Sequence, residues 1–264
     1  MNDMDLGLDG KAAIITGGNS GLGLAVAREL AQEGCDVCIC ARNEERLAAA
    51  KREIQSVSEG VVRAVRCDVS VAEDIAAVVE ETVALFGTVH ILVSNAGVST
   101  TRDFLDVERA DWDYSMRSIL YAASEFSRLV IPYMQRQKWG RIIMTGSTSS
   151  RQPRPRRVVS NASKAALLNF TKSLAGEFVR DGILVNIVNP GRFNTHWPER
   201  IAKMAAESGR TEEEVYAEVT KDIAIGRLGE AEEFAAAVAF LASERASYIT
   251  GAALQVDGGE MYSI

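Results

Sequence analysis

Residues 16–23 read Thr-Gly-Gly-Asn-Ser-Gly-Leu-Gly, a spacing that suits the binding of a phosphate-bearing ligand. The segment follows the apolar run 12–15 and precedes a stretch, 24–31, whose apolar residues recur at helical spacing. Glycines between a strand and a helix let the backbone approach a pyrophosphate, and the first N–H groups of the helix point at the anion. Glycine clusters also occur in ordinary loops, so the strand–turn–helix context carries the prediction of dinucleotide binding. The residues concerned are Gly17, Asn19, Ser20, Gly21, Leu22 and Gly23.

Two later positions also carry residue types that suit a bound nucleotide. Asp68 follows the expected strand 61–66, where its carboxylate can accept a hydrogen bond from an amino group. Gly97 follows the expected strand 90–93 and has no Cβ to prevent close approach of the backbone to a ligand. Taken alone, Asp68 fits a turn or cap residue better.

Strand-like and helix-like segments alternate along the chain, which predicts a parallel sheet with helices on both faces. No repeat and no linker rich in Pro, Gly or Ser interrupts this alternation, so we expect one domain, residues 1–264. A polar helical stretch, 196–223, interrupts the alternation as an excursion from the sheet, and we expect a lid insertion at about 193–226. The expected strands are 12–15, 36–40, 61–66, 90–93, 141–144 and 183–188, and the long helices are 112–137 and 162–179.

Composition and charge exclude several classes of protein. The 264 residues are 47% hydrophobic and 25% charged, as in an ordinary globular protein that buries a substantial core. The net charge of −7 repels polyanions, so nucleic acid is not an expected partner. The first five residues, Met-Asn-Asp-Met-Asp, lack the basic and apolar regions of a signal peptide, and no apolar stretch is long enough to span a membrane. We therefore expect a cytoplasmic protein.

The four cysteines do not form a metal site. Cys35 and Cys38 are spaced as C-x-x-C, but no second pair and no nearby histidine completes a set of ligands. We therefore interpret all four cysteines, including Cys40 and Cys67, as reduced and buried residues of a cytosolic protein. No metal is expected.

With the glycine turn, the order and spacing of further motifs resemble the short-chain dehydrogenase/reductase family from end to end. The resemblance is strongest to its 3-oxoacyl-carrier-protein reductase-like branch. It implies a single doubly wound Rossmann-type α/β domain with a parallel seven-stranded sheet, an oxidoreductase of small molecules, and a homo-oligomer, either tetramer or dimer. The motifs are Cys67-Asp68-Val69, Ser94-Asn95-Ala96-Gly97, Ser147, Lys164, Pro190-Gly191 with Thr195, and Val256-Asp257-Gly258-Gly259.

The resemblance also implies roles for single residues around a nicotinamide cofactor. The glycine turn, with Asn19, Ser20 and Leu22, contacts the phosphates and ribose. The adenine is bordered by Asp68 and Val69. The far ribose and the nicotinamide are held by Asn95, Ala96, Gly97, Lys164, Pro190, Gly191 and Thr195.

The end of the second expected strand indicates which cofactor is preferred. An acidic residue there binds the ribose diol of NAD, whereas an arginine suits the 2′-phosphate of NADP. The chain has Ala41 followed by Arg42, so NADP(H) is favoured over NAD(H). The alternative for Arg42 is a solvated charge at the start of a helix.

The chain departs from the family at two catalytic positions. The family's active site uses Asn, Ser, Tyr and Lys, with the Tyr as acid/base. Here Ser147 and Lys164 are present, Ser160 stands where the family has Tyr, and Ile119 stands at the Asn position. An aliphatic hydroxyl is a poor acid or base without activation, and it is shorter than a phenol. A water can fill the gap between Ser160, Lys164 and the substrate.

Residues 151–157, Arg-Gln-Pro-Arg-Pro-Arg-Arg, concentrate positive charge in an acidic chain. In this fold the loop borders the substrate pocket, which suits an anionic substrate such as a carboxylate or a phosphopantetheine thioester. A solvated loop that pairs with a neighbouring subunit explains the charge equally well. Phe193 and Trp197 either close on a ligand or pack in the core or an oligomer contact, and His90 and His196 are interpreted as structural.

Two functions follow from these observations. The first is an NADP(H)-dependent reductase of a carbonyl, or dehydrogenase of a secondary alcohol, that uses Ser147, Ser160 and Lys164. The second is a catalytically weak or inactive NADP(H)-binding sensor or scaffold, which the loss of both Tyr and Asn favours.

Overall fold

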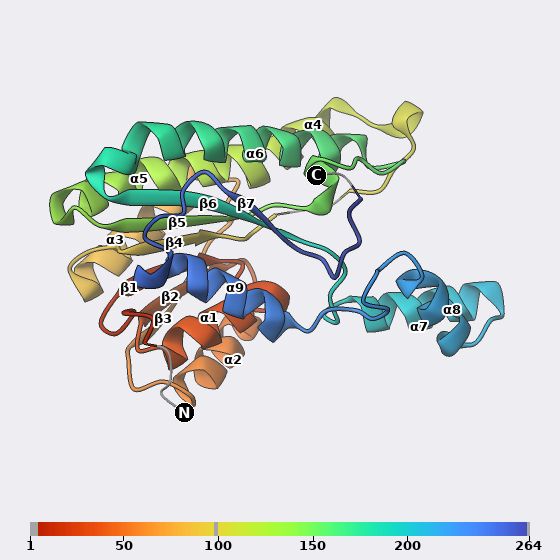
Figure 1. The fold of residues 1–264 in the computed structure, drawn as a ribbon, viewed down its shortest axis with the longest axis horizontal. Helices are drawn as coiled ribbons and strands as arrows, with labels where there is room; N and C mark the ends of the chain where they lie inside the picture. Colours follow the sequence, from red (N-terminus) through yellow and green to blue (C-terminus); the bar gives the residue numbers. More distant parts are fainter. Residues whose placement is uncertain (1–4, 98–99, 263–264) are drawn as a thin grey trace.

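The computed structural model describes residues 5–97 and 100–262, in which seven parallel strands form one sheet in the order β3-β2-β1-β4-β5-β6-β7 (Figure 1). Met1 to Met4, on which part of the signal-peptide argument rests, lie outside the described residues. The order reverses direction between β1 and β4, as in doubly wound folds, whose ligands bind at the carboxyl ends of the strands. The strands are β1 (Ala12–Thr16), β2 (Asp36–Ala41), β3 (Val62–Arg66), β4 (Ile91–Ser94), β5 (Gly140–Thr145), β6 (Ile183–Pro190) and β7 (Ala253–Val256).

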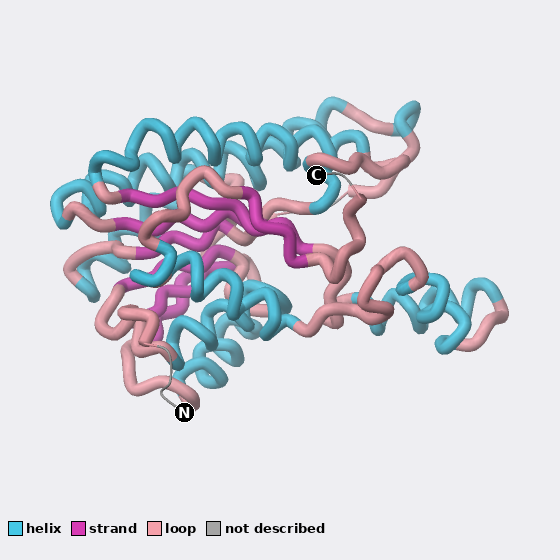
Figure 2. Tube along the Cα trace, in the orientation of Figure 1, coloured by secondary structure: helices cyan, strands magenta, loops and turns pink. Residues whose placement is uncertain are grey.

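Helices cover both faces of the sheet, and each face has its own apolar core (Figure 2). The central strands are buried along nearly their whole length, because neither face of a doubly wound parallel sheet meets water. One face is covered by α1 (Gly21–Gln32), α2 (Glu44–Gln55) and α9 (Ala231–Ala242). The other is covered by α3 (Ala72–Phe86), α5 (Ala122–Gln137) and α6 (Val158–Phe178). The predicted fold class is confirmed.

Two helical stretches differ from their predicted bounds in ways that affect the pocket. The predicted helix 112–137 begins as α4 (Arg109–Met116) and then widens into a π-helical segment (Arg117–Tyr121) before α5. Ile119 lies in this π-helical segment. The predicted helix 162–179 begins four residues earlier, at Val158, so Ser160 lies in the first turn of α6 and not in the preceding loop.

The polar stretch after β6 forms two helices that stand out from the sheet, α7 (Trp197–Ser208) and α8 (Glu212–Thr220) (Figure 1). Their inward side chains form a small separate core with residues from the return segment. Phe193, just before this insertion, packs edge-to-face on Phe234 of α9 at 5.8 Å between ring centroids, and it also lines the cavity described below. The small core consists of Ile201, Ala205, Val215, Val219, Ile223 and Leu228.

Two further findings concern the classes of site that the sequence argues against. In residues 5–97 and 100–262, none of the helices combines the length and apolarity that a membrane span requires. No group of three or more His, Cys, Asp or Glu side chains in those same ranges is placed to hold a metal ion. The four cysteines are free and buried.

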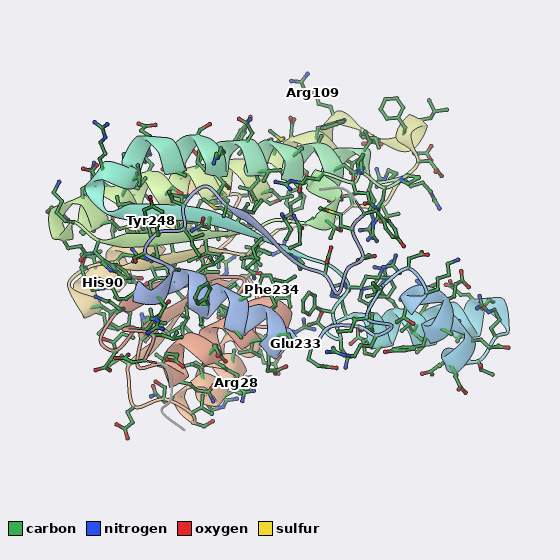
Figure 3. The ribbon with its side chains drawn as sticks, in the orientation of Figure 1. Arg28, His90, Arg109, Glu233, Phe234 and Tyr248 are labelled. Carbon is green, nitrogen blue, oxygen red and sulfur yellow. The ribbon has the colours of Figure 1, made fainter. Side chains whose placement is uncertain are left out.

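His90 lies just before β4, at the end of the sheet remote from α7 and α8 (Figure 3). Its Nδ1 accepts a hydrogen bond from the Ala12 N–H at 2.9 Å, and its ring meets Trp139 edge-on. Burial, with help from Lys11, lowers its pKa below 6.5. The structure therefore requires the neutral ring, which confirms a structural environment for His90.

A pH dependence of stability follows from this lowered pKa. Because the unfolded chain binds a proton at His90 more readily than the folded chain, the free energy of unfolding is expected to fall as the pH drops through about 6.5. Urea titrations between pH 8 and 5 measure that slope. His90→Asn keeps an acceptor for the Ala12 N–H and should make the dependence of the unfolding free energy on pH less steep. The dependence that remains is expected to come from His196, because burial lowers the pKa of that residue too. An unchanged slope in His90→Asn would contradict the assignment.

Candidate active site

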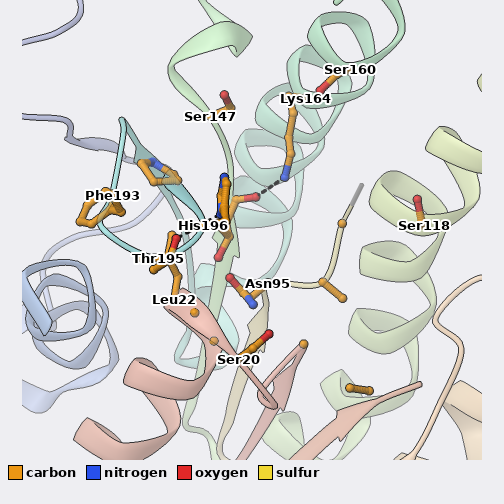
Figure 4. Close-up of a pocket in the computed structure, with 18 of the residues that line it drawn as sticks. Ser20, Leu22, Asn95, Ser118, Ser147, Ser160, Lys164, Phe193, Thr195 and His196 are labelled. Carbon is orange, nitrogen blue, oxygen red and sulfur yellow. Dashed lines mark hydrogen bonds between the residues drawn. The ribbon is translucent and has the colours of Figure 1, made fainter. Parts of the chain in front are cut away.

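A cavity of about 890 Å³ opens at the carboxyl ends of β1, β4, β5 and β6. The structure brings to this one cavity every residue to which the sequence analysis gave a catalytic or cofactor-binding role, whereas Ile119 does not line it. One side is formed by the glycine turn and the end of β2, and the other by α6 and the segment after β6 (Figure 4). The predicted residues along its wall are Gly17, Asn19, Ser20, Gly21, Leu22, Gly23, Arg42, Asp68, Val69, Asn95, Ala96, Gly97, Ser147, Ser160, Lys164, Pro190, Gly191 and Thr195.

The glycine turn leaves the start of α1 open toward the cavity. Ser20 is the N-cap, yet its side chain does not cap the helix, and no acidic residue lies in the first turn. The N–H groups of that turn are therefore free of side-chain acceptors, as an anion site at a helix start requires. Gly23 permits the tight turn, because a Cβ there would lie 2.3 Å from the Gly17 carbonyl oxygen. Gly21 has a left-handed φ of 54°, a conformation that favours glycine, and a Cβ there would make only an ordinary van der Waals contact with Thr195, at 3.6 Å.

Asn95 and Asp68 both serve the backbone around the cavity. The Asn95 side-chain amide donates to the Thr16 carbonyl at 3.0 Å, and its backbone N–H donates to the Thr16 hydroxyl, so the end of β4 is fastened to the end of β1. Asp68 Oδ1 accepts hydrogen bonds from the backbone N–H and the hydroxyl of Ser70. This is the geometry of a turn residue, the alternative role that the sequence offers for Asp68. Burial raises the pKa of Asp68, but these bonds and two arginines outweigh it and lower that pKa overall.

Arg42 reaches over the cavity from the end of β2. One guanidinium nitrogen donates to the Tyr114 hydroxyl of α4 at 3.0 Å, which fixes the direction of the side chain. Arg46, on the first turns of α2, lines the same side of the cavity. The basic surface there therefore has two arginines within the described part of the chain.

Lys164 lies in the cavity wall on α6, and its Nζ donates to the carbonyl of Thr145 at the end of β5, at 2.6 Å (Figure 4). Desolvation by burial lowers its pKa to about 8. A Cβ at Gly97 would stand 3.6 Å from this Nζ, so the absence of a side chain at Gly97 leaves room beside the amine. The amine can therefore exchange a proton near neutral pH.

Two hydroxyls face the same space as Lys164. Ser160 lies one helical turn before it, on the same face of α6, and is 5% exposed. Ser147 follows β5, and its Oγ accepts from the backbone N–H and the hydroxyl of Ser149 at 3.1 and 3.0 Å. Ser147 uses its own proton in neither bond and can donate it to a ligand oxygen.

Ile119, which the resemblance places at the family's Asn position, is 2% exposed and belongs to the apolar core, and its Cγ1 would lie 3.5 Å from a Cβ at Gly97. It is not among the residues that line the cavity, whereas its neighbour Ser118 is. The Ser118 hydroxyl donates to the Tyr114 carbonyl within the helix at 2.8 Å. The π-helical segment therefore presents a serine, and not an amide, to the cavity.

The arginine-rich loop divides between the cavity and the surface. Arg154 and Arg157 line the cavity, which confirms that the loop borders it. Arg151 is exposed and does not line the cavity, and Arg156 pairs with Asp103 at 2.7 Å on the surface. The four arginines of the loop therefore do not share one direction, since two of them line the cavity and the other two lie on the surface.

Several residues of the cavity have no motif in the sequence. Arg192 follows β6, and Arg200 lies in the first turn of α7, where it stacks on Trp197 at 4.4 Å from the ring centroid. Tyr114 lies far from Arg42 in sequence, and nothing local marks it. Trp197 and Arg200 are three residues apart. In a stretch that is expected to be helical, this spacing predicts that they lie on one face.

Comparisons with known proteins agree with this geometry. A family model described as enoyl-(acyl carrier protein) reductase matches residues 17–260. The chain is 34% identical to a 3-oxoacyl-(acyl-carrier-protein) reductase from Haemophilus influenzae, over 96% of this chain and 98% of that one. It is 35% identical to a 4-formylbenzenesulfonate dehydrogenase from Comamonas testosteroni, over 96% and 99%. A crystal structure of L-sorbose reductase from Gluconobacter frateurii, complexed with NADPH and L-sorbose, superimposes with a TM-score of 0.96 at 35% identity, over 99% of this chain and 100% of that one.

Proposed function

The chain belongs to the short-chain dehydrogenase/reductase family, and on that premise we propose that it is an NADP(H)-dependent oxidoreductase that interconverts a carbonyl and a secondary alcohol through a Ser–Lys site. The observation that carries the proposal is the position of Lys164, an amine with a pKa of about 8 beside open space in a cavity that begins at a glycine turn.

The residues present fit a dinucleotide. The open start of α1 and the turn 17–23 suit the pyrophosphate, and Asp68 and Val69 border the side where an adenine would lie. Asn95 to Gly97 and Lys164, which line the cavity farther along, would hold the far ribose, and Pro190, Gly191 and Thr195 would hold the nicotinamide. The cofactor, when bound, supplies a hydride to the carbonyl carbon or takes one from the alcohol.

NADP(H), in preference to NAD(H), is supported by the residues at the end of β2. Arg42 and Arg46 supply guanidinium groups for a 2′-phosphate, and Ala41 stands where a carboxylate would bind a free ribose diol. NADPH is bound in the sorbose reductase structure, and the Tyr114 contact holds Arg42 over the cavity.

Replacing Arg42 tests the cofactor preference. Arg42→Ala is expected to raise KM for NADPH by about 10- to 100-fold, because a charge-assisted pair with phosphate is lost, and to change KM for NADH little. Steady-state kinetics with both cofactors measures the two values. Arg52→Ala, on the following helix α2, removes an equal charge outside the cavity and is the control. Equal effects on the two cofactors would contradict the 2′-phosphate assignment.

A proton must reach the carbonyl oxygen during reduction. Three side chains of the cavity can orient that oxygen and supply the proton. The Ser147 hydroxyl donates a hydrogen bond to the substrate oxygen and orients it. Lys164, through a water held between its ammonium and Ser160, supplies the proton. Ser160 is too short to contact the oxygen directly and acts by positioning that water.

The proposal is tested by measuring NADPH oxidation by the purified protein with a panel of carbonyl compounds. The panel includes acyl thioesters and anionic aldehydes. These classes follow from the arginines of the cavity and from relatives that act on 3-oxoacyl and formylbenzenesulfonate compounds. Turnover that Lys164 variants lose supports the reductase. Tight NADPH binding without turnover on any compound would overturn it in favour of an NADP(H)-binding sensor or scaffold, which the replacement of Tyr and Asn by Ser160 and Ile119 favours.

We extend the proposal to assembly and compartment. A homo-oligomer, tetramer or dimer, is consistent with tyrosines fully or half exposed on the surface, Tyr248 and Tyr121, and with the family resemblance. A cytoplasmic location is consistent with the four free, buried cysteines.

A further inference from the structure

Four guanidinium groups converge at the end of the cavity away from Arg42. They come from three segments that are distant in sequence: Arg154 and Arg157 from the loop before α6, Arg192 from the end of β6, and Arg200 from α7. Arg157 is the N-cap residue of α6. We call these four residues the arginine cluster.

One buried carboxylate holds half of this cluster together. Glu260, 4% exposed, offers its Oε1 both to Arg154 at 2.5 Å and to Arg192 at 2.8 Å. Arg192 also donates to the Val219 carbonyl at the end of α8. Arg157 and Arg200 form no ion pair with any carboxylate of the described residues. Glu260 therefore leaves most of the cluster's positive charge uncompensated.

The groups of the cluster repel one another. Burial lowers the pKa of Arg157, and the charges of Arg154, Arg200 and Arg192 lower it further against the attraction of Glu260. Burial also lowers the pKa of Arg192, although the nearby carboxylates of Glu260 and Asp222 act to raise it. Like charges held close in a partly desolvated space cost free energy, which a bound oxyanion would recover.

The cluster lies at a defined distance from the proposed reacting centre. Arg157, Ser160 and Lys164 occupy positions i, i+3 and i+7 of α6, so all three face the cavity from one side of the helix. Seven residues at the helical rise separate the levels of Arg157 and Lys164 by about 10 Å. Trp197, stacked against Arg200, provides an apolar wall beside the cluster.

We propose that the arginine cluster binds an oxyanion of the substrate, so that the enzyme acts on carbonyl compounds whose carboxylate, sulfonate or phosphate lies several bonds from the reacting carbon. The proposal rests on the oxidoreductase function above and names its substrate class. Arg157 and Arg200, which have no carboxylate partner among the described residues, make the principal contacts. Arg154 and Arg192, already fixed by Glu260, hold the shape of the site and supply charge.

A series of matched aldehydes tests this specificity. The probes are 4-formylbenzoate, 4-formylbenzenesulfonate and 4-formylphenyl phosphate, with methyl 4-formylbenzoate as the neutral counterpart. The wild type is expected to show a kcat/KM at least about 10-fold higher for an anionic probe than for the neutral ester, since each charge-assisted contact contributes about this much. The ranking of the three anions identifies which oxyanion fits.

Arg157→Gln is expected to raise KM for the preferred anionic aldehyde by about 10- to 100-fold and to leave KM for the neutral ester unchanged. Arg200→Gln should also raise this KM. Because Arg200 is exposed, its replacement is not expected to disturb folding. Arg151→Gln removes an equal charge from the same loop outside the cavity and is the matched control. Because like charges are removed, neither Arg157→Gln nor Arg200→Gln should lower the melting temperature.

Equal kcat/KM for charged and neutral probes, or equal loss in Arg151→Gln and Arg157→Gln, would overturn the proposal. A binding measurement separates its failure from failure of the reductase function. With NADP+ saturating, so that the aldehyde cannot be reduced, 4-formylbenzoate should raise the melting temperature of the wild type and of Lys164→Met, but not that of Arg157→Gln. Protection without turnover would refute the reductase and leave the anion site intact, whereas turnover without charge preference would refute the anion site alone.

Discussion

Lys164→Met is expected to lower kcat for carbonyl reduction by about 10²- to 10⁴-fold, the range that a positioned acid contributes. The residue is the only titratable group that the proposed mechanism uses for proton transfer. Its Nζ is anchored on the Thr145 carbonyl at 2.6 Å, and Met has a similar length without the charge. Single-turnover measurement of NADPH oxidation reports the loss directly, and a binding titration reports how far cofactor affinity also changes.

The pH profile separates a catalytic from a structural role for Lys164. Burial lowers its pKa to about 8, so the ammonium that donates the proton disappears as the pH rises through that value. Wild-type reduction should therefore slow above about pH 8, while oxidation of the alcohol, which needs the neutral amine, should accelerate. Lys172→Met, on the same helix, is the control and should keep the wild-type profile. A residual rate in Lys164→Met that follows the wild-type profile would contradict the assignment.

Much of the site could be predicted from sequence because its motifs are local. Residues 16–23 set both the conformation of the turn and the start of α1, so their spacing alone indicates the phosphate side. Ser160 and Lys164 fall on one face of a helix by their i, i+4 spacing. The alternation of segments was sufficient for the parallel sheet, since the central strands are buried and helices connect successive strands.

The arginine cluster could not be predicted, because its members meet only through tertiary contacts. The sequence draws attention to the run 151–157, but Arg156 turns to Asp103 and Arg151 to the surface. Arg192 and Arg200 stand alone in sequence, and their position depends on where α7 leaves the end of β6. Glu260, which fixes two of the four, comes from the far end of the chain.

The burial of Ile119 is a second feature beyond the reach of sequence. Alignment of motifs places it at the family's Asn position, but only the structure reveals that its neighbour Ser118 lines the cavity while Ile119 belongs to the apolar core. A π-helical turn depends on one additional residue per turn, and local propensity does not indicate it.

Ser160→Tyr is expected to raise kcat for small carbonyl substrates by at least about 100-fold, because it restores a phenol long enough to contact the substrate oxygen. Ser160 lies on the cavity face of α6, so a larger side chain can extend into open space and need not enter the core. The ammonium of Lys164, one turn away, lowers the pKa of a phenol placed there. Kinetics of NADPH oxidation with the neutral aldehyde ester measures the gain.

Two companion variants decide what that gain means. Ser160→Phe adds the same bulk without the hydroxyl and should give no increase, which separates acid catalysis from a change in cavity shape. Combining Ser160→Tyr with Lys164→Met should remove most of the increase, since the phenol then lacks the charge that makes it acidic. Measurable turnover in the wild type establishes that the Ser–Lys site is a working substitute for Tyr. Activity confined to Ser160→Tyr would instead mean that the chain kept its cofactor site and lost its reaction, because a single phenol would then be all that the cavity lacked.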